Sequence, residues 1–398
     1  MKKLRFERVG IALFCATLIG SGVMTLIKGA KPIAKATLSG IQKGYTSSGI
    51  GGMVEGAISG LETGVNENIY AKTSYINLFG LTSNILNKHY IIDTHPTNSV
   101  VKDNNDQLQF ICFKVDTKPY VDEIAEVKST LDEMDIPLVY VQTPLKTIDG
   151  YTKMPDGILD YANSNTDEFM NLLAEEGINT IDLRKNIKEE TMDLKSLFYT
   201  TDHHWKTQTA FWAVGEVVDY LKESIGIDLD PNQFYTDKAQ YSLINYEKSF
   251  LGSQGRRVGK YYDGVDDYTL MLPNYETSYT ATIHKTNGST THEGTFEDAI
   301  VKYNLLKNPD DLFTNRYAAY FGADFPEVIV QNHLADNDKK VLIFKDSFGL
   351  PFSAFLSTMV SETRLIDKRY FSGNIEEYIK AYNPDLVLYV YKSINTQK

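Results

Sequence analysis

The residues best suited to chemistry stand in one short run, Thr201–Trp205, which reads Thr-Asp-His-His-Trp. A carboxylate two residues before a histidine, as Asp202 is before His204, can contact the imidazole within a local turn. That contact fixes the tautomer and stabilises the imidazolium formed during proton transfer. The run precedes a predicted helix at an expected strand-to-helix loop, where α/β sheets build active sites. We therefore predict a general base here, against the alternative of two polar loop histidines.

A second candidate is Ser347, in the run Lys345–Gly349, which reads Lys-Asp-Ser-Phe-Gly. It follows an apolar run and precedes a predicted helix. Such a strand-turn-helix arrangement exposes a serine hydroxyl at the sheet edge and directs backbone N–H groups at the atoms it attacks. Those amides could hold a developing oxyanion. The alternative is a serine that only caps the helix. Together the two motifs fill the roles of a Ser-His-Asp triad.

Short apolar strands alternating with amphipathic helices are expected to position both motifs. From about residue 119 the pattern becomes α/β, which indicates a parallel sheet with helices on both faces. The expected strands are 138–141, a short run around Ile181, 341–344, 364–366 and 386–391; the expected helices are 121–134, one capped by Asp167, 210–221, 351–359 and 375–381.

Residues 228–338 break this rhythm. They are rich in Tyr, Asn, Asp and Thr, with short alternating runs such as Tyr279–Ile283. Because sheet strands resume after them, we interpret them as a β-rich insertion within one catalytic domain, 119–398, rather than as a separate domain.

The N-terminus predicts where the protein is located. A basic flank precedes Val9–Ile27, 19 residues without a charge, which as a helix span about 28 Å and just cross a hydrocarbon core. The flank favours an inside N-terminus, so residues 1–28 form a cytoplasmic tip and single-pass anchor in the cell membrane, with the catalytic domain outside the cytoplasm. The alternative is a signal peptide cleaved near Ala34–Ala36. We expect residues 29–118 to form a membrane-proximal spacer and N-terminal segment, with a poor core over Gly-rich residues 37–65.

Composition excludes several classes of protein. In 398 residues, 42% apolar and 23% charged, Lys and Arg total 40 against 52 Asp and Glu, a net charge of −12. Such an acidic chain repels phosphate backbones, so we expect no nucleic-acid partner. The two cysteines, Cys15 and Cys112, exclude a disulfide framework and a Cys-rich zinc site. Scarce cysteine also suits a bacterial envelope protein without disulfide dependence.

The motifs resemble a known family. Asp-His-His-Trp gives its name to the DHHW proteins, which look like relatives of the SGNH-hydrolase-like alginate O-acetylation proteins with their Asp-x-His-Trp motif. The similar segments, in the expected order, are Val139–Lys146, Thr201–Trp205, Phe250–Gly259, Val341–Phe348 and Ile366–Phe371. The resemblance implies Asp202 as acid, His204 as base and Ser347 as nucleophile, with His203 at the variable position. It departs from the family at Lys345, where a glycine is common, and no Gly-x-Asn-Asp block supplies an oxyanion donor.

The resemblance implies an O-acyltransferase that moves acetyl groups onto hydroxyls of a cell-envelope or secreted polysaccharide, with no cofactor and no metal. Acetyl would be supplied across the membrane by a polytopic membrane-bound O-acyltransferase. We expect substrate contacts from the side chains His203, Trp205, Arg256, Arg369 and Tyr370. For Arg256 the alternative is a solvated loop, and for Arg369 a structural pair with a carboxylate.

Three rival interpretations remain open. A metal-dependent phosphoesterase with an Asp-His-His motif needs further ligand motifs, and none is apparent. A polysaccharide deacetylase would use the same triad, because only the access of water to the acyl-enzyme differs. A non-catalytic polysaccharide-binding or assembly protein could keep the fold without the reaction.

Overall fold

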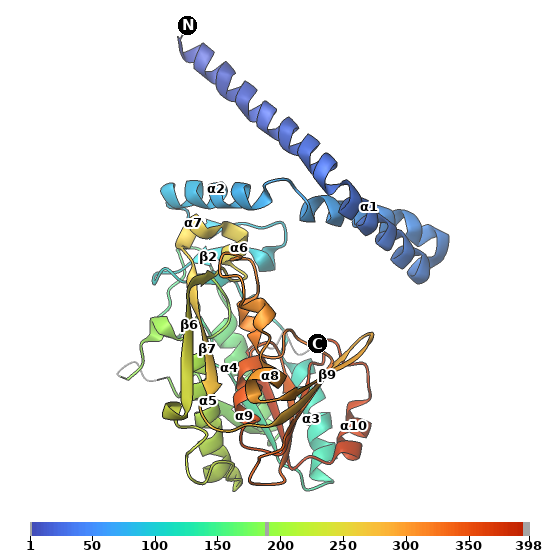
Figure 1. The fold of residues 1–398 in the computed structure, drawn as a ribbon. Helices are drawn as coiled ribbons and strands as arrows, with labels where there is room; N and C mark the ends of the chain where they lie inside the picture. The colour runs from blue at the N-terminus through green and yellow to red at the C-terminus, as the bar shows by residue number, and fades with distance from the viewer. Residues whose placement is uncertain (1, 188–190, 393–398) are drawn as a thin grey trace. The chain divides into compact units, whose positions relative to one another are not determined.

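The computed structural model describes residues 2–187 and 191–392. The chain divides into two compact units, one ending at Thr82 and one beginning at Ser83. Each unit has its own architecture (Figure 1), and the second contains both predicted motifs.

The first unit is a helical hairpin. Helix α1 (Lys2–Glu67) breaks at Ser48 and Gly49, and its two arms pack backbone to backbone. A Cβ atom on Gly40 would lie 2.0 Å from the Gly56 carbonyl oxygen. Residues 37–65, which we expected to form a spacer with a poor core, are therefore packed helix, because small residues at four-residue spacing let two helices approach closely. Helix α2 (Lys72–Ile85) follows.

Helix α1 is long and apolar enough to cross a membrane. Its expected span displays a continuous apolar surface to the surroundings, with large side chains exposed at Val9, Ile11, Leu13, Phe14, Leu18, Ile19, Val23, Leu26 and Ile27. An N-terminal helix of this kind serves as a membrane anchor or as a signal sequence.

The second unit is built on a mixed sheet formed by eight strands of the described residues. The five predicted strands are its parallel part, in the spatial order β5 (Asn179–Asp182), β4 (Leu138–Gln142), β13 (Leu386–Tyr391), β11 (Lys340–Lys345) and β12 (Glu362–Ile366). Three antiparallel strands extend it past β12: β10 (Glu327–Asn332), β8 (Tyr279–Lys285) and β9 (Gly288–Gly294).

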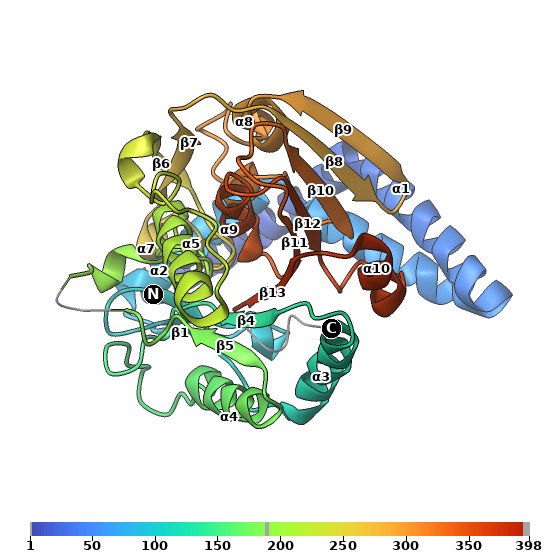
Figure 2. The same cartoon turned by 90° about the horizontal axis from the view of Figure 1, so that it is seen from below.

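Helices cover both faces of this sheet, as predicted (Figure 2). One face packs against α3 (Lys118–Asp132), α4 (Ala162–Glu175) and α10 (Ile375–Tyr382), and the other against α5 (Thr207–Tyr220) and α9 (Gly349–Leu356). Successive strand residues alternate between the two cores, so both faces are apolar.

The predicted start of α4 was wrong. The helix begins at Ala162, and the Asp160 carboxylate accepts the Ala162 N–H at 3.0 Å. Asp167, the predicted cap, lies inside the helix and pairs with Arg184 at 2.8 Å. The N-cap position is Tyr161, and the preceding Asp160 accepts the first N–H of the helix.

The β-rich residues 228–338 are part of the same compact unit. They contribute β8, β9 and β10 to the sheet and a separate antiparallel pair, β6 (Tyr241–Phe250) and β7 (Asp266–Pro273). Short helices α6 (Gly255–Val258), α7 (Lys260–Asp263) and α8 (Phe296–Ile300) connect them. Upstream lies a small sheet of β1 (Tyr90–Ile91), β2 (Val100–Lys102) and β3 (Leu108–Phe110), whose core includes Val258 and Tyr262. The single-turn 3-10 helices are Pro96–Asn98, Leu194–Ser196, Lys238–Gln240, Tyr303–Leu305 and Arg316–Ala319, and a π-helical turn, Leu221–Ile225, ends α5.

Candidate active site

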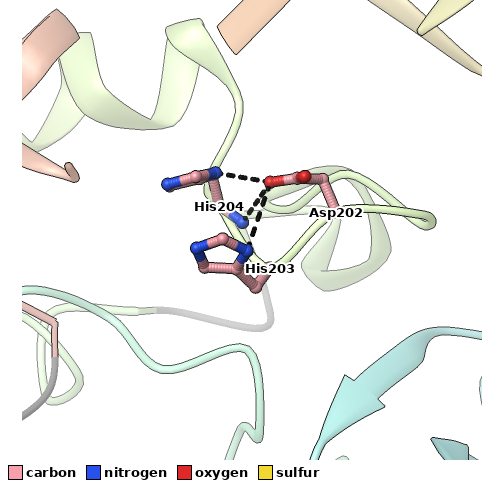
Figure 3. Close-up of side chains that lie close together, drawn as sticks. All are labelled: Asp202, His203 and His204. Atoms are coloured by element: carbon pink, nitrogen blue, oxygen red, sulfur yellow. Dashed lines mark hydrogen bonds and ion pairs between the residues drawn. The ribbon is translucent and has the colours of Figure 1, made fainter. Parts of the chain in front are cut away.

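The two predicted motifs meet at the carboxyl edge of the parallel strands. Asp202 and His204 lie on a tight loop before α5, and Ser347 lies between β11 and α9. Asp202 Oδ1 lies 2.5 Å from His204 Nδ1, and His204 Nε2 lies 2.7 Å from Ser347 Oγ. Figure 3 shows the Asp202 carboxylate facing the imidazole of His204. The chain therefore brings acid, base and nucleophile into one continuous hydrogen-bonded line, the geometry of a Ser-His-Asp triad.

The turn that carries Ser347 is fixed by its neighbour Asp346. This buried carboxylate accepts the N–H of Phe348 at 2.9 Å and the N–H of Lys392 at 3.0 Å. Phe348, not Ser347, is the N-terminal cap position of α9, so the Ser347 hydroxyl is not acting as a helix cap. The N–H of Gly349 donates to the Asp346 carbonyl at 3.0 Å. The N–H groups of Phe348 and Gly349 are thus engaged within the turn and are not directed at an oxyanion.

Asp202 is held as an anion in a buried site. Burial alone would raise its pKa, but the histidines and hydrogen bonds from His204 and the Ser253 N–H outweigh that effect and hold the pKa of Asp202 well below its usual range. The Ser253 N–H lies 2.5 Å from Oδ2, and the His204 N–H lies 3.0 Å from Oδ1. An ionised Asp202 can orient His204 and stabilise its protonated form.

Tyr317 supports the base from the other side. Its ring stacks on the His204 imidazole, with centroids 3.7 Å apart and planes 10° apart. Its hydroxyl accepts from Trp205 Nε1 at 3.1 Å and donates to the Ser347 carbonyl at 3.0 Å. Burial raises the pKa of Tyr317, which keeps this donor protonated. Nothing in its sequence neighbourhood, Arg316–Tyr320, indicated this role.

The Gly-rich loop beginning at Gly252 packs closely against Asp202. The Gly252 N–H donates to Thr201 Oγ1 at 2.9 Å, and the N–H groups of Gln254 and Gly255 donate to the Thr201 carbonyl. A Cβ atom on Gly252 would fall 2.1 Å from Asp202 Cβ. Only glycine fits this close approach of the two backbones.

Gly252→Ala is expected to lower the reactivity of the Ser347 hydroxyl on the order of 100-fold, because the added methyl group displaces the Asp202 carboxylate from His204. The rate of active-site labelling by a sulfonyl fluoride measures this loss. The matched control is Gly215→Ala in α5, where a Cβ meets nothing within 4 Å. Equal activity in both variants would mean that this loop does not set the position of Asp202.

His203 is the predicted substrate residue best placed beside the triad. Its Nδ1 lies 2.7 Å from Ser253 Oγ, and its side chain is 29% exposed. Burial and the neighbouring His204 hold its pKa well below the usual value, so the imidazole stays neutral. It lines a small hollow together with Phe110, Gln254 and Lys392.

The other four predicted substrate residues are buried, paired with other groups or turned to solvent. Trp205 is completely buried and packs on Phe348 with centroids 5.3 Å apart, so the indole is not exposed to a substrate. Arg256 donates to the Phe313 carbonyl at 3.1 Å. Arg369 forms a two-pronged pair with Asp367, at 2.8 and 2.5 Å, as in the structural alternative. Tyr370 is 54% exposed beside the Arg369 guanidinium, with no contact to the triad among the described residues.

Lys345, the departure from the family glycine, belongs to the same charged cluster as Arg369. Its buried ammonium lies 2.5 Å from Asp324 and 3.6 Å from Asp367, and Arg369 contacts the same two acids. Burial alone would raise the pKa of Asp324, but Lys345 and Arg369 lower it below the usual value. Two cations thus balance two anions next to the turn that carries Ser347, and the buried lysine has ionic partners there.

Asp202, His203 and His204 also offer three potential metal-ligand atoms within 4.8 Å of one another. However, Asp202 Oδ1 and His204 Nδ1 are 2.5 Å apart, a hydrogen-bond distance. Two ligands each about 2.0–2.2 Å from one tetrahedral zinc ion would lie farther apart than that. The same histidine also contacts Ser347, so the arrangement fits proton transfer better than metal binding.

Part of the chain matches a known family of protein domains. Residues 115–245, which hold Asp202 and His204, match the family model of an SGNH hydrolase-like domain, described as acetyltransferase AlgX. No curated protein matches the chain.

Solved structures extend the likeness to most of the chain. PatB1 from Bacillus cereus with a sulfonyl adduct aligns with a TM-score of 0.60 at 20% identity, over 76% of this chain and 95% of that one. A second PatB1 structure gives 0.60 at 22% identity, over 75% and 97%. A DHHW family protein from Eubacterium siraeum gives 0.56 at 19% identity, over 75% and 91%. The chain has an SGNH hydrolase-like fold, and the resemblance to this group is confirmed.

Proposed function

We propose that this protein is an extracytoplasmic O-acyltransferase that moves acetyl groups onto hydroxyls of a cell-envelope or secreted polysaccharide. The observation that carries the proposal is the unbroken line of contacts from Asp202 through His204 to Ser347. A serine hydroxyl in contact with an imidazole, which an ionised carboxylate orients, is the arrangement of an activated nucleophile.

The reaction proceeds through an acetyl-enzyme. Ser347 Oγ attacks the acetyl carbonyl while His204 Nε2 accepts its proton, and the donor leaves as His204 returns that proton to it. A sugar hydroxyl then attacks the Ser347 ester, His204 accepts the hydroxyl proton, and the proton passes to Ser347 Oγ as the acetylated sugar leaves. Asp202 remains ionised throughout and stabilises the imidazolium in both halves.

Two comparisons support this chemistry. The matching family model is described as that of an acetyltransferase. The PatB1 structure of similar fold carries a sulfonyl adduct, and sulfonyl reagents capture activated hydroxyl nucleophiles. We propose that the triad serine here reacts with the same class of reagent, and that neutral His203 contacts the acceptor sugar.

The acceptor test uses the full chain in detergent, an activated acetyl ester as donor and a panel of cello-, chito- and manno-oligosaccharides. We expect acetyl to appear on a sugar faster than it is lost to water. Turnover to water alone in the presence of every sugar would support a polysaccharide deacetylase with the same triad. A folded chain that neither labels nor turns over would support a binding or assembly role.

The membrane location makes a separate prediction. With α1 as an uncleaved anchor and the N-terminus inside, the full chain is expected to stay in the membrane fraction after alkaline carbonate extraction. An external protease should digest the catalytic unit in intact spheroplasts. Release of a soluble chain lacking its first residues would instead identify the helix as a cleaved signal peptide.

Acetyl donors such as acetyl-CoA are cytoplasmic, so the donor group must be supplied across the membrane. We propose, from the family resemblance, a polytopic membrane-bound O-acyltransferase as the supplier. Deleting such a neighbour should abolish acetylation of the polymer in cells while leaving activity on a soluble activated ester intact. Unchanged polymer acetylation would contradict this partnership.

A further inference from the structure

The segment that carries the catalytic acid lies between two buried side chains of opposite charge. Lys146 follows β4, and Asp266 begins β7 in the β-rich insertion; both are less than a tenth exposed. No motif singled out either residue for a role in catalysis. Buried charges require partners. The contacts among Asp202, His204 and Ser347 do not explain why Lys146 and Asp266 are buried at this place.

Asp266 takes the N–H groups of the segment. Its Oδ1 accepts from the Thr200 N–H at 2.8 Å, and its Oδ2 accepts from the Thr201 N–H at 2.7 Å and from the Thr201 hydroxyl at 2.6 Å. These charge-assisted bonds hold the residues just before Asp202 from one side.

Lys146 takes the carbonyl groups of the same segment. Its Nζ donates to the Thr200 oxygen at 3.0 Å and to the Asp202 oxygen at 2.8 Å. The same Nζ also donates to the Leu108 carbonyl oxygen at 2.6 Å and to Gln254 Oε1 at 3.3 Å. The N–H groups of Thr200 and Thr201 therefore face an anion, and the C=O groups of Thr200 and Asp202 face a cation, so both charges favour one backbone conformation.

We infer that Lys146 and Asp266 are positioning residues that clamp residues 200–202 so that the Asp202 carboxylate meets His204. The inference rests on the proposed function, because it assigns a role to the acid of that triad. It also explains why the insertion is needed at the site: it supplies Asp266 as well as the Gly252 loop. Neither side chain contacts the reacting atoms, so neither is a catalytic residue.

The clamp has a pH dependence with a definite sign. Burial lowers the pKa of Lys146 to about 8, against the opposing effects of Asp266, Asp202 and Asp103, and Lys392 also lowers it. Loss of the proton leaves two donors for the carbonyls, so activity should fall above pH 8. The pKa of an unfolded lysine is about 10.4. Between pH 8 and that value the unfolded chain binds more protons than the folded chain, so this group increases the free energy of unfolding as the pH rises. Activity and stability therefore move in opposite directions.

The test compares Lys146→Met, Asp266→Asn and the double variant in the full chain. Each single change is expected to slow sulfonyl fluoride labelling of Ser347 by on the order of 100-fold, since a displacement near 1 Å can cost that much. The double variant should lose far less than the product of the two, because both side chains hold one segment. Lys302→Met and Asp230→Asn are the matched controls: Lys302 also has its pKa lowered to about 8 by burial, and Asp230 is a buried acceptor of main-chain N–H groups.

A second readout needs no turnover. The proton between His204 Nδ1 and Asp202 should give a far-downfield NMR resonance in the wild-type chain, and it should shift or broaden in the clamp variants and not in the controls. Wild-type labelling rates and an unchanged resonance in folded clamp variants would overturn the inference. If Lys146→Met does not fold, wild-type labelling and an unchanged resonance in a folded Asp266→Asn chain would overturn it equally. Labelling and resonance that respond as expected, without acetyl transfer to any sugar, would reject the proposed function and leave the clamp standing.

Discussion

Ser347→Ala is expected to lower acetyl transfer by about 10⁶-fold while leaving the fold intact. The substitution removes the oxygen that lies 2.7 Å from His204 Nε2. Ser347 is half-buried at the sheet edge, and the turn around it is held by Asp346 and not by its hydroxyl. The loss is therefore chemical, with no cavity in the core to destabilise the chain.

The measurement is initial velocity with an activated acetyl ester, together with the melting temperature. Ser361→Ala is the matched control. Ser361 directly precedes β12, at the opposite edge of the sheet from Ser347, and its hydroxyl donates to the Lys339 carbonyl. A Ser347→Ala chain with more than a few per cent of wild-type activity would remove Ser347 from the mechanism.

Asp202→Asn is expected to lower turnover on the order of 10⁴-fold with little change in the donor KM. The asparagine keeps the shape of the carboxylate but loses its charge, so it no longer favours protonated His204. Its amide can also present N–H to Nδ1, which selects the wrong imidazole tautomer. In the wild-type chain the Ser253 N–H lies 2.5 Å from Asp202 Oδ2, and the substitution also removes this charged acceptor.

Stability separates this effect from simple unfolding. Because the pKa of Asp202 is depressed in the folded chain, its charge stabilises the fold at neutral pH, and that contribution is lost as pH falls through the folded value. Asp202→Asn should therefore flatten the acid side of the stability curve. Asp230→Asn, at another buried acid, serves as the control for loss of a buried charge. Turnover within tenfold of wild type would show that Asp202 does not orient the base.

The parallel core of the fold could be predicted from sequence because its central strands each contain a short apolar run, at 138–141, 341–344 and 386–391. β4, β11 and β13 are buried on both faces, and their residues have no competing helical periodicity. The antiparallel strands β8 and β10 were harder to place in the same sheet, because their partners lie far away in the chain and alternation alone does not identify a neighbour.

The meeting of Asp202, His204 and Ser347 could be predicted because these residues carry their chemistry in residue type and local spacing. The side chains around them could not, because Tyr317, Lys146 and Asp266 make contacts with residues 30 to 66 positions away. For Trp205 the sequence suggested too much. Its place in the motif led us to expect a substrate contact, but the indole is buried in the structure. In the first unit, glycine content indicated a spacer, and only the pairing of two helix arms turns the same residues into a packed interface.

The most direct test is intact-mass spectrometry of the full chain after brief exposure to an activated acetyl ester, followed by peptide mapping and addition of an acceptor sugar. We predict one added acetyl group, mapped to Ser347, absent in Ser347→Ala, and lost to the sugar when the sugar is supplied. Acetylation at any other residue, or transfer to sugar without an acetyl-Ser347 intermediate in trapped samples, would contradict the mechanism.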